Sequence, residues 1–179
     1  EFAIEEAAAQ VAAAASVEGC GGVTIAHSAE EVAQLWKTRK ALSPALRNVA
    51  PKKINEDVAV PVSQLPLLIE GLERLSTEHR VKIVNFGHAG NGNIHVNLLT
   101  DPDDPQENRR AEACLAEIFS LVLQLRGTLS GEHGVGIVKR EFIARELDPV
   151  ALALMHQIKR QFDPNNILNP GKTLPDPAA

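Results

Sequence analysis

Residues 86–97 read FGHAGNGNIHVN and carry two imidazoles among small and amide side chains. If the chain folds back between His88 and His95, Cβ atoms on the facing strands lie about 4.5–5.5 Å apart, so both rings can reach one metal ion. Two-residue alternation then places Asn97 on the same face as His95. The alternative is that the histidines only hydrogen-bond within a turn, and this segment alone leaves the choice open.

A second group of reactive side chains lies in residues 130–136, SGEHGVG, where Glu132 and His133 are adjacent. Neighbouring side chains of an extended segment point in opposite directions, so we expect them to have different roles. In one division Glu132 is a third metal ligand, giving a His₂Glu set with an open coordination position, and His133 is the acid or base that faces the substrate. The alternative is a helix N-terminus that favours the Glu132 charge.

A third feature is a basic segment between Trp36 and Asn55 in a chain whose formal net charge is −5. Such a segment suits an anionic ligand, and an arginine can hold a carboxylate with two hydrogen bonds. The alternative is an ordinary solvated surface. Beside a metal that binds a hydroxyl, a cation that binds a carboxylate would hold a 2-hydroxy acid at two points. The cations are Lys37, Arg39, Lys40, Arg47, Lys52 and Lys53.

The composition restricts the class of protein further. A hydrophobic content of 44% in 179 residues predicts a globular fold with a core, and 3% aromatic residues with a negative net charge argue against nucleic-acid binding. Cys20 and Cys114 are far apart, so neither a thiolate zinc site nor a disulfide framework is indicated, and a reduced cytoplasmic setting is expected. The start at Glu1-Phe2, without Met, suggests a piece of a longer protein.

The elements that must position these residues alternate between helices and strands, with one tight hairpin. This order predicts an α+β fold in which a mainly antiparallel sheet is covered by helices, within a single domain of residues 1–179. Apolar spacing, caps and turn residues predict helices at 3–17, 29–42 (ending before Pro44), 63–80, 106–125, 140–146 and 149–162, and strands at 23–26, 57–61, 81–86, 94–99 and 127–131.

Three blocks of sequence, GHAGNGNIH, SGEHGVGIVK and FDPNNILNPGK, occur in this order along the chain. With them the chain resembles the C-terminal domain of FAD-linked oxidases, the group of D-lactate dehydrogenase, the glycolate oxidase flavin subunit and D-2-hydroxyglutarate dehydrogenase. The resemblance implies a ferredoxin-like substrate domain that packs over a flavin held by a separate N-terminal domain, which these residues do not contain.

The resemblance also implies roles for individual residues. It implies metal binding by His88, His95 and Glu132, with His133 as the catalytic base. Position 91 departs from the family pattern, which more often has Asp than Asn here, and we expect weaker orientation of the metal ligands. Substrate contacts are implied for Arg39, which would grip the carboxylate, Ser43, Lys53 and Asn97, and flavin contacts for Asn169 and Lys172.

The implied function is flavin-dependent oxidation of a D-2-hydroxy acid, such as lactate, glycolate or 2-hydroxyglutarate, to the 2-oxo acid. The cofactors would be FAD and a divalent metal, for which the nitrogen and oxygen ligands favour zinc. A quinone or cytochrome would accept the electrons. The enzyme would be cytoplasmic or peripheral to the inner membrane, with homo-oligomers allowed, and this chain alone would be inactive. The alternatives are a metal-dependent hydrolase and a metal- or anion-binding module without a redox role.

Overall fold

The computed structural model describes residues 2–176, which divide into two compact units between Ala45 and Leu46. The first unit contains helices α1 (Phe2–Ala15) and α2 (Ala29–Ala45). Helix α2 begins at a capping box, because the Ser28 hydroxyl accepts the Glu31 N–H and the Glu31 carboxylate accepts the Ser28 N–H. It continues through Pro44, one residue before its end, rather than stopping ahead of it.

The strand predicted at residues 23–26 is wrong. This segment is irregular, and its apolar side chains Val23 and Ile25 are about two-fifths exposed. β-Branched residues form a strand where a neighbouring strand supplies hydrogen bonds and cover, and the sheet in the described part of the chain is built from other segments.

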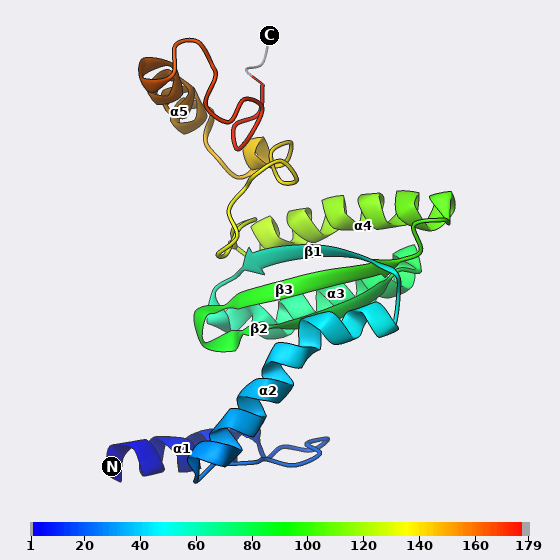
Figure 1. Cartoon of the computed structure of the whole chain (residues 1–179), viewed down its shortest axis with the longest axis vertical. Coiled ribbons are helices and arrows are strands. Elements are labelled where there is room, and N and C mark those ends of the chain that lie inside the picture. Colours follow the sequence, from blue (N-terminus) through cyan, green and yellow to red (C-terminus); the bar gives the residue numbers. More distant parts are fainter. Residues whose placement is uncertain (1, 177–179) are drawn as a thin grey trace. The chain divides into compact units, whose positions relative to one another are not determined.

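The second unit is built on an antiparallel sheet of three strands, in the order β1-β3-β2. The strands are β1 (Lys52–Ala59), β2 (Lys82–His88) and β3 (Asn93–Thr100), so β3 is central (Figure 1). Strands β2 and β3 form the predicted hairpin, joined by the 3-10 turn η3 (Ala89–Asn91) and Gly92. Gly92 has a φ of 70°, and a Cβ there would collide with the Val60 carbonyl oxygen, so the turn requires glycine.

Helices α3 (Leu65–His79) and α4 (Pro105–Gln124) cover one face of this sheet (Figure 1). Asp104 caps the N-terminus of α4, and its carboxylate accepts the N–H groups of Gln106 and Glu107. The helices and strands enclose one apolar core. Its buried members include Val58, Leu68, Leu72, Leu75, Ile94, Val96, Leu98, Cys114, Ile118, Phe119 and Val122.

The order β1, α3, β2, β3, α4 confirms the predicted α+β fold and follows the split β-α-β pattern of ferredoxin-like domains. The strand predicted at residues 127–131 is reduced to one bridge, in which Thr128 pairs with Ala59 on the outer edge of β1. A fourth strand would occupy this edge in the complete pattern. The chain instead leaves the sheet after this bridge and forms the loop that contains Glu132 and His133.

The remaining elements are short turns and one helix. The 3-10 turns are η1 (Leu46–Asn48), η2 (Val62–Gln64) and η4 (Ile143–Arg145), so the helix predicted at 140–146 is wrong apart from this turn. Helix α5 (Pro149–Phe162) has the predicted bounds, and the Asp163 carboxylate after it accepts the N–H groups of Ile167 and Leu168. Among the described residues, the helices are too short or too polar to span a bilayer.

Candidate metal and substrate site

The sheet face opposite the helices carries a row of polar side chains. Ile94, Val96 and Leu98 of β3 belong to the apolar core, so the residues that alternate with them, His95 and Asn97, face away from the helices. On β1, the residues paired with His95 and Asn97 are Asp57 and Asn55. On β2, the residue paired with His95 is Phe86, whose ring lies 5.7 Å from the imidazole. His88 ends the same strand, on the same face.

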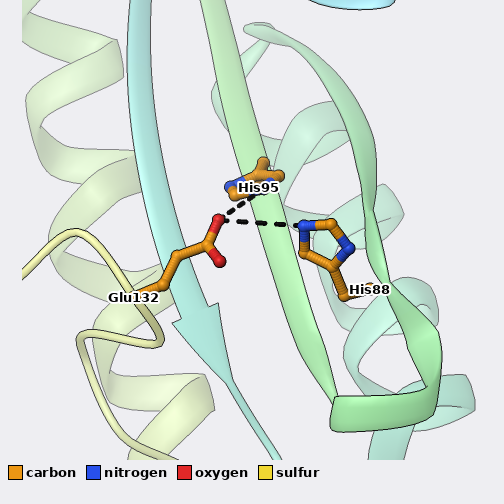
Figure 2. Close-up of side chains that lie close together, drawn as sticks. All are labelled: His88, His95 and Glu132. Atoms are coloured by element: carbon orange, nitrogen blue, oxygen red, sulfur yellow. Dashed lines mark ion pairs between the residues drawn. The ribbon is translucent and has the colours of Figure 1, made fainter. Parts of the chain in front are cut away.

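Three possible metal ligands converge at the end of this row (Figure 2). The Glu132 Oε1 atom lies 3.2 Å from His95 Nε2 and 3.8 Å from His88 Nε2, and one ligand atom from each residue lies within 4.8 Å of the others. Tetrahedral bonds of about 2.0–2.1 Å separate neighbouring ligand atoms by about 3.3 Å. The two distances from Glu132 are close to this value, so the three residues could hold a metal ion and leave a further coordination position open.

The three possible ligands differ in their exposure to solvent. His95 is buried at 6% exposure, whereas the side chains of His88 and Glu132 are about half exposed. Burial holds the pKa of His95 below its ordinary value. The nearby His133 and His88 also lower this pKa, whereas the Glu132 carboxylate raises it. A neutral imidazole is the form that coordinates a metal. The site thus has a buried floor on β3 and an open side toward solvent.

His133 lies on the same side as Glu132, contrary to our expectation that the two side chains would point in opposite directions. Its ring stacks on that of His95 at 5.2 Å, and its Nε2 atom lies 3.7 Å from Glu132 Oε1. The expectation assumed extended backbone, but this segment is a loop that turns further at Gly134 and Gly136, where φ is 79° and 56°. Both side chains therefore reach one region of the site.

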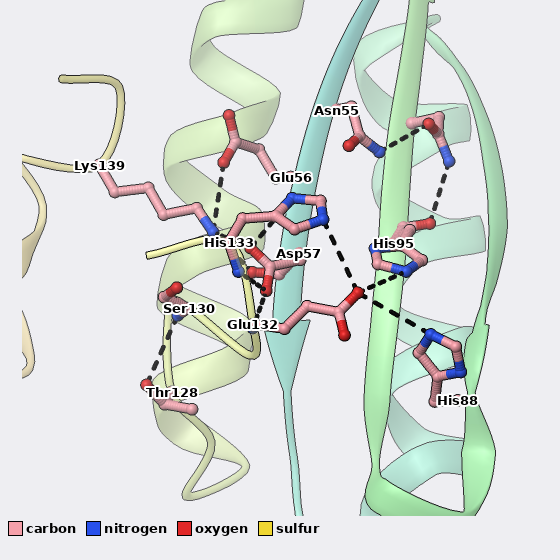
Figure 3. Close-up of polar contacts among 11 residues, drawn as sticks. Asn55, Glu56, Asp57, His88, His95, Thr128, Ser130, Glu132, His133 and Lys139 are labelled. Carbon is pink, nitrogen blue, oxygen red and sulfur yellow. Dashed lines mark hydrogen bonds and ion pairs between the residues drawn. The ribbon is translucent and has the colours of Figure 1, made fainter. Parts of the chain in front are cut away.

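Under the loop lies a buried network of charges centred on Asp57 (Figure 3). The Asp57 carboxylate accepts the backbone N–H groups of Glu132 and His133 and an N–H of Lys139, and its Oδ1 atom lies 3.6 Å from His133 Nδ1. Burial alone would raise the pKa of Asp57, but these hydrogen bonds hold it well below its usual range. Burial raises the pKa of Glu56, whose carboxylate lies 3.6 Å from Lys139 Nζ.

Asn97, predicted to contact substrate, has a fully buried side chain that bonds within the sheet. Its Oδ1 atom accepts an N–H from Asn55 at 2.8 Å, and its Nδ2 atom donates to the carbonyls of Val84 and His95 at 2.9 and 3.0 Å. In this arrangement the Asn97 amide links all three strands next to His95. A substrate contact of Asn97 stays a prediction.

The other predicted residues lie in separate parts of the chain. Lys53 is on the site face of β1, four residues before Asp57 and thus about 13 Å along the strand. Arg39 and Ser43 are half-buried residues of α2 in the first unit. Asn169 and Lys172 are exposed, bond to each other at 3.3 Å, and line an open groove of about 830 Å³ between α5 and the tail. Their roles stay predictions.

Three residues have site contacts that were not predicted from the sequence, namely Asn55, Asp57 and Lys139. A signal for the first two was available, because pairing a β1 strand in register with β3 places them opposite Asn97 and His95. Lys139 stands out in the sequence as a cation just after SGEHGVG, but its contact with Asp57 gave no local signal, because the two residues are 82 positions apart and only the fold brings them together.

Comparison with known protein families identifies the family of this chain. The family described as FAD linked oxidases, C-terminal domain, matches residues 1–173. The chain belongs to the FAD-linked oxidases. The predicted resemblance is thereby confirmed, and the site described above lies within the matched residues of this family's C-terminal domain.

Three curated relatives match most of the chain at similar identity. The chain is 37% identical to a glycolate oxidase subunit GlcD of Bacillus subtilis over 84% of its residues, and 34% identical to a D-2-hydroxyglutarate dehydrogenase of Stutzerimonas stutzeri over 83%. It is 36% identical to a mitochondrial D-lactate dehydrogenase [cytochrome] of Arabidopsis thaliana over 84% of its residues and 27% of that protein. The first two relatives are each covered over 32% of their length, so the chain spans about a third of them.

A solved structure shows the same fold at lower sequence identity. The 4-ethylphenol oxidase of Gulosibacter chungangensis, in complex with isoeugenol, superposes with a TM-score of 0.60 at 19% identity. The match covers 84% of this chain and 32% of the oxidase.

Proposed function

We propose that this chain is the substrate- and metal-binding domain of a flavin-dependent dehydrogenase that oxidises a D-2-hydroxy acid to the 2-oxo acid. The observation that supports this most strongly is the convergence of His88, His95 and Glu132, with His133 stacked beside them. Relatives named for glycolate, D-lactate and D-2-hydroxyglutarate support the substrate class.

In this proposal His88, His95 and Glu132 hold a divalent metal, with zinc as the ion that suits two imidazoles and a carboxylate. A bound zinc ion would act there as a Lewis acid toward the substrate hydroxyl. The neutral form of His95, favoured by its burial, is ready to coordinate, and the half-exposed Glu132 and His88 leave an open side for the substrate. Asn91 lies in the exposed turn η3, at the position where the family more often has Asp.

His133 accepts the hydroxyl proton in this proposal. Its Nδ1 atom faces the Asp57 carboxylate at 3.6 Å, and its Nε2 atom lies on the Glu132 side at 3.7 Å. A carboxylate beside one ring nitrogen orients the imidazole, which leaves the other nitrogen to work as a base. FAD, when bound, would supply the acceptor for the two electrons and the C2 hydrogen that the substrate loses.

Further contacts complete the proposal. Arg39 grips the substrate carboxylate, while Ser43, Lys53 and Asn97 contribute polar contacts to substrate. FAD is held mainly by an N-terminal domain of the same protein, with Asn169 and Lys172 near it. A quinone or cytochrome accepts the electrons, and the enzyme is cytoplasmic or peripheral to the inner membrane.

The test uses the full-length protein that carries the flavin domain. Turnover with D-lactate, glycolate and D-2-hydroxyglutarate is measured with a dye as electron acceptor, alongside metal content by elemental analysis. His133→Ala is expected to lower turnover by about 10²–10⁴-fold and keep the metal, whereas Glu132→Gln should lose both.

Two results would contradict this proposal. One is a His133→Ala protein that loses metal in proportion to its activity, since His133 would then be a metal ligand rather than the base. The other is hydrolysis of a simple ester by the isolated chain, which would favour a metal-dependent hydrolase. The isolated chain is expected to be colourless and without dehydrogenase activity.

A further inference from the structure

The Asp57 carboxylate stands between the sheet and the loop that carries Glu132 and His133. Asp57 is fully buried on the edge strand β1, directly opposite His95. Its Oδ2 atom accepts the backbone N–H groups of both Glu132 and His133, the latter at 3.1 Å. This single oxygen therefore bonds the backbone of Glu132 and His133 to strand β1, which pairs with the strand of His95 (Figure 3).

The other oxygen of Asp57 is also engaged. Oδ1 accepts an N–H from Lys139 at 2.6 Å, and the same ammonium donates to the Asp57 carbonyl at 2.7 Å. Lys139 is itself buried at 3% exposure, so its charge and that of Asp57 neutralise each other away from water. Because Lys139 follows the same loop, the carboxylate is bonded at both the start and the end of residues 132–139.

This arrangement differs from a salt bridge that only offsets two charges. Glu56, the neighbour of Asp57, also lies near Lys139, but strand alternation turns it toward the helix-covered face. Asp57 alone of the two contacts the loop backbone and the His133 ring. Hydrogen bonds from an N–H to a carboxylate are strong and directional, so they fix where the next side chains begin.

We propose that Asp57 is a positioning residue that sets the placement of Glu132 and His133 over the histidine pair, with Lys139 holding its carboxylate in place. The proposal rests on the function proposed above for the part that concerns metal. Groups that orient metal ligands without touching the metal commonly change metal affinity by about 10- to 100-fold when removed.

The first test needs no variant and no metal. Amide hydrogen exchange of Glu132 and His133, followed by NMR in the apo chain, is expected to be about 10- to 100-fold slower than in an unstructured loop, the factor of a charge-assisted hydrogen bond. Exchange of both amides at unstructured rates would overturn the proposal.

The second test compares two variants that make the same chemical change at neighbouring positions. Asp57→Asn is expected to weaken zinc affinity of the chain, measured by calorimetry, by about 10- to 100-fold, and to release the protection of the 132 and 133 amides. Glu56→Gln changes a contact of the same lysine but leaves the hydrogen bonds of Asp57 to the loop in place, so it is expected to keep zinc affinity within about twofold.

Equal zinc affinity in Asp57→Asn and the wild type would overturn the proposal, as would equal weakening in both variants. If Asp57→Asn does not fold, the wild-type exchange rates decide the matter. A wild-type chain that binds no zinc but protects both amides would refute the proposed metal site while supporting the role of Asp57.

Discussion

Substitution of Gly131 by alanine tests the closest approach between the loop and the sheet. A Cβ at this position would lie 2.9 Å from Asn93 Cγ and 3.1 Å from Asp57 Oδ2, and would overlap the Asn93 amide nitrogen. Asn93 is buried at 6% exposure, so either its amide rotates within a packed site or the loop moves outward. Overpacking of this kind costs about 1–3 kcal/mol. For a chain of this size, that is a fall in Tm of about 2–12 °C.

The matched control is Gly90→Ala in the neighbouring hairpin. A Cβ at Gly90 would meet nothing within 4 Å, and its φ lies outside the left-handed region. We expect the free energy of unfolding of this variant to lie within about 1 kcal/mol of the wild-type value. Both variants are compared by urea unfolding followed by circular dichroism, with zinc affinity as a second measurement. If Gly131→Ala unfolds at the same urea concentration as the wild type and Gly90→Ala, the loop does not approach the sheet as described.

Three further predictions concern the rest of the chain. Cys20 should react with a thiol reagent in the folded chain and Cys114 only after unfolding, because Cys20 is exposed and burial raises the pKa of the Cys114 thiol to about 11; equal rates would contradict this. Phe119→Ala, which removes a fully buried ring packed 4.7 Å from that of Phe142, should lower the free energy of unfolding by about 3–5 kcal/mol in urea titrations. The hydrogen bond from Lys159 holds the pKa of Asp163 below its ordinary value, so its stabilisation of the tail should be complete above about pH 4 and lost as the pH falls further; NMR shifts of the Ile167 and Leu168 amides across this range would show it, and a change only near neutral pH would not fit.

The hairpin and its two histidines could be predicted because the information is local. Alternating apolar residues in β2 and β3, with glycines between them, specify both strands, and their pairing brings His88 and His95 to one face. The bounds of these strands differ from the prediction by only one or two residues. That two imidazoles of one such hairpin lie close together can therefore be predicted from the local sequence, whereas their role as metal ligands stays a prediction.

The support beneath the site could not be predicted in the same way. Strand β1 begins at Lys52, five residues before the predicted start, because pairing with β3 outweighs the weak strand propensity of Lys-Lys-Ile-Asn. The Asp57 to Lys139 contact joins two segments that are distant in sequence, and both residues taken alone read as ordinary surface charges. The placement of Glu132 beside His133 likewise depends on loop geometry, which has no periodic pattern.

The central position of β3 has a consequence for how this domain tolerates insertions and deletions. Its successive residues alternate between the apolar core and the imidazole row, and both of its edges are paired. Loss or gain of one residue within 94–98 would exchange the two sets, placing His95 and Asn97 against the helices and Ile94 and Val96 in the site. Length variation among natural versions of this domain should therefore be concentrated in segments such as the exposed turn at 101–103, and be excluded from the middle of this strand.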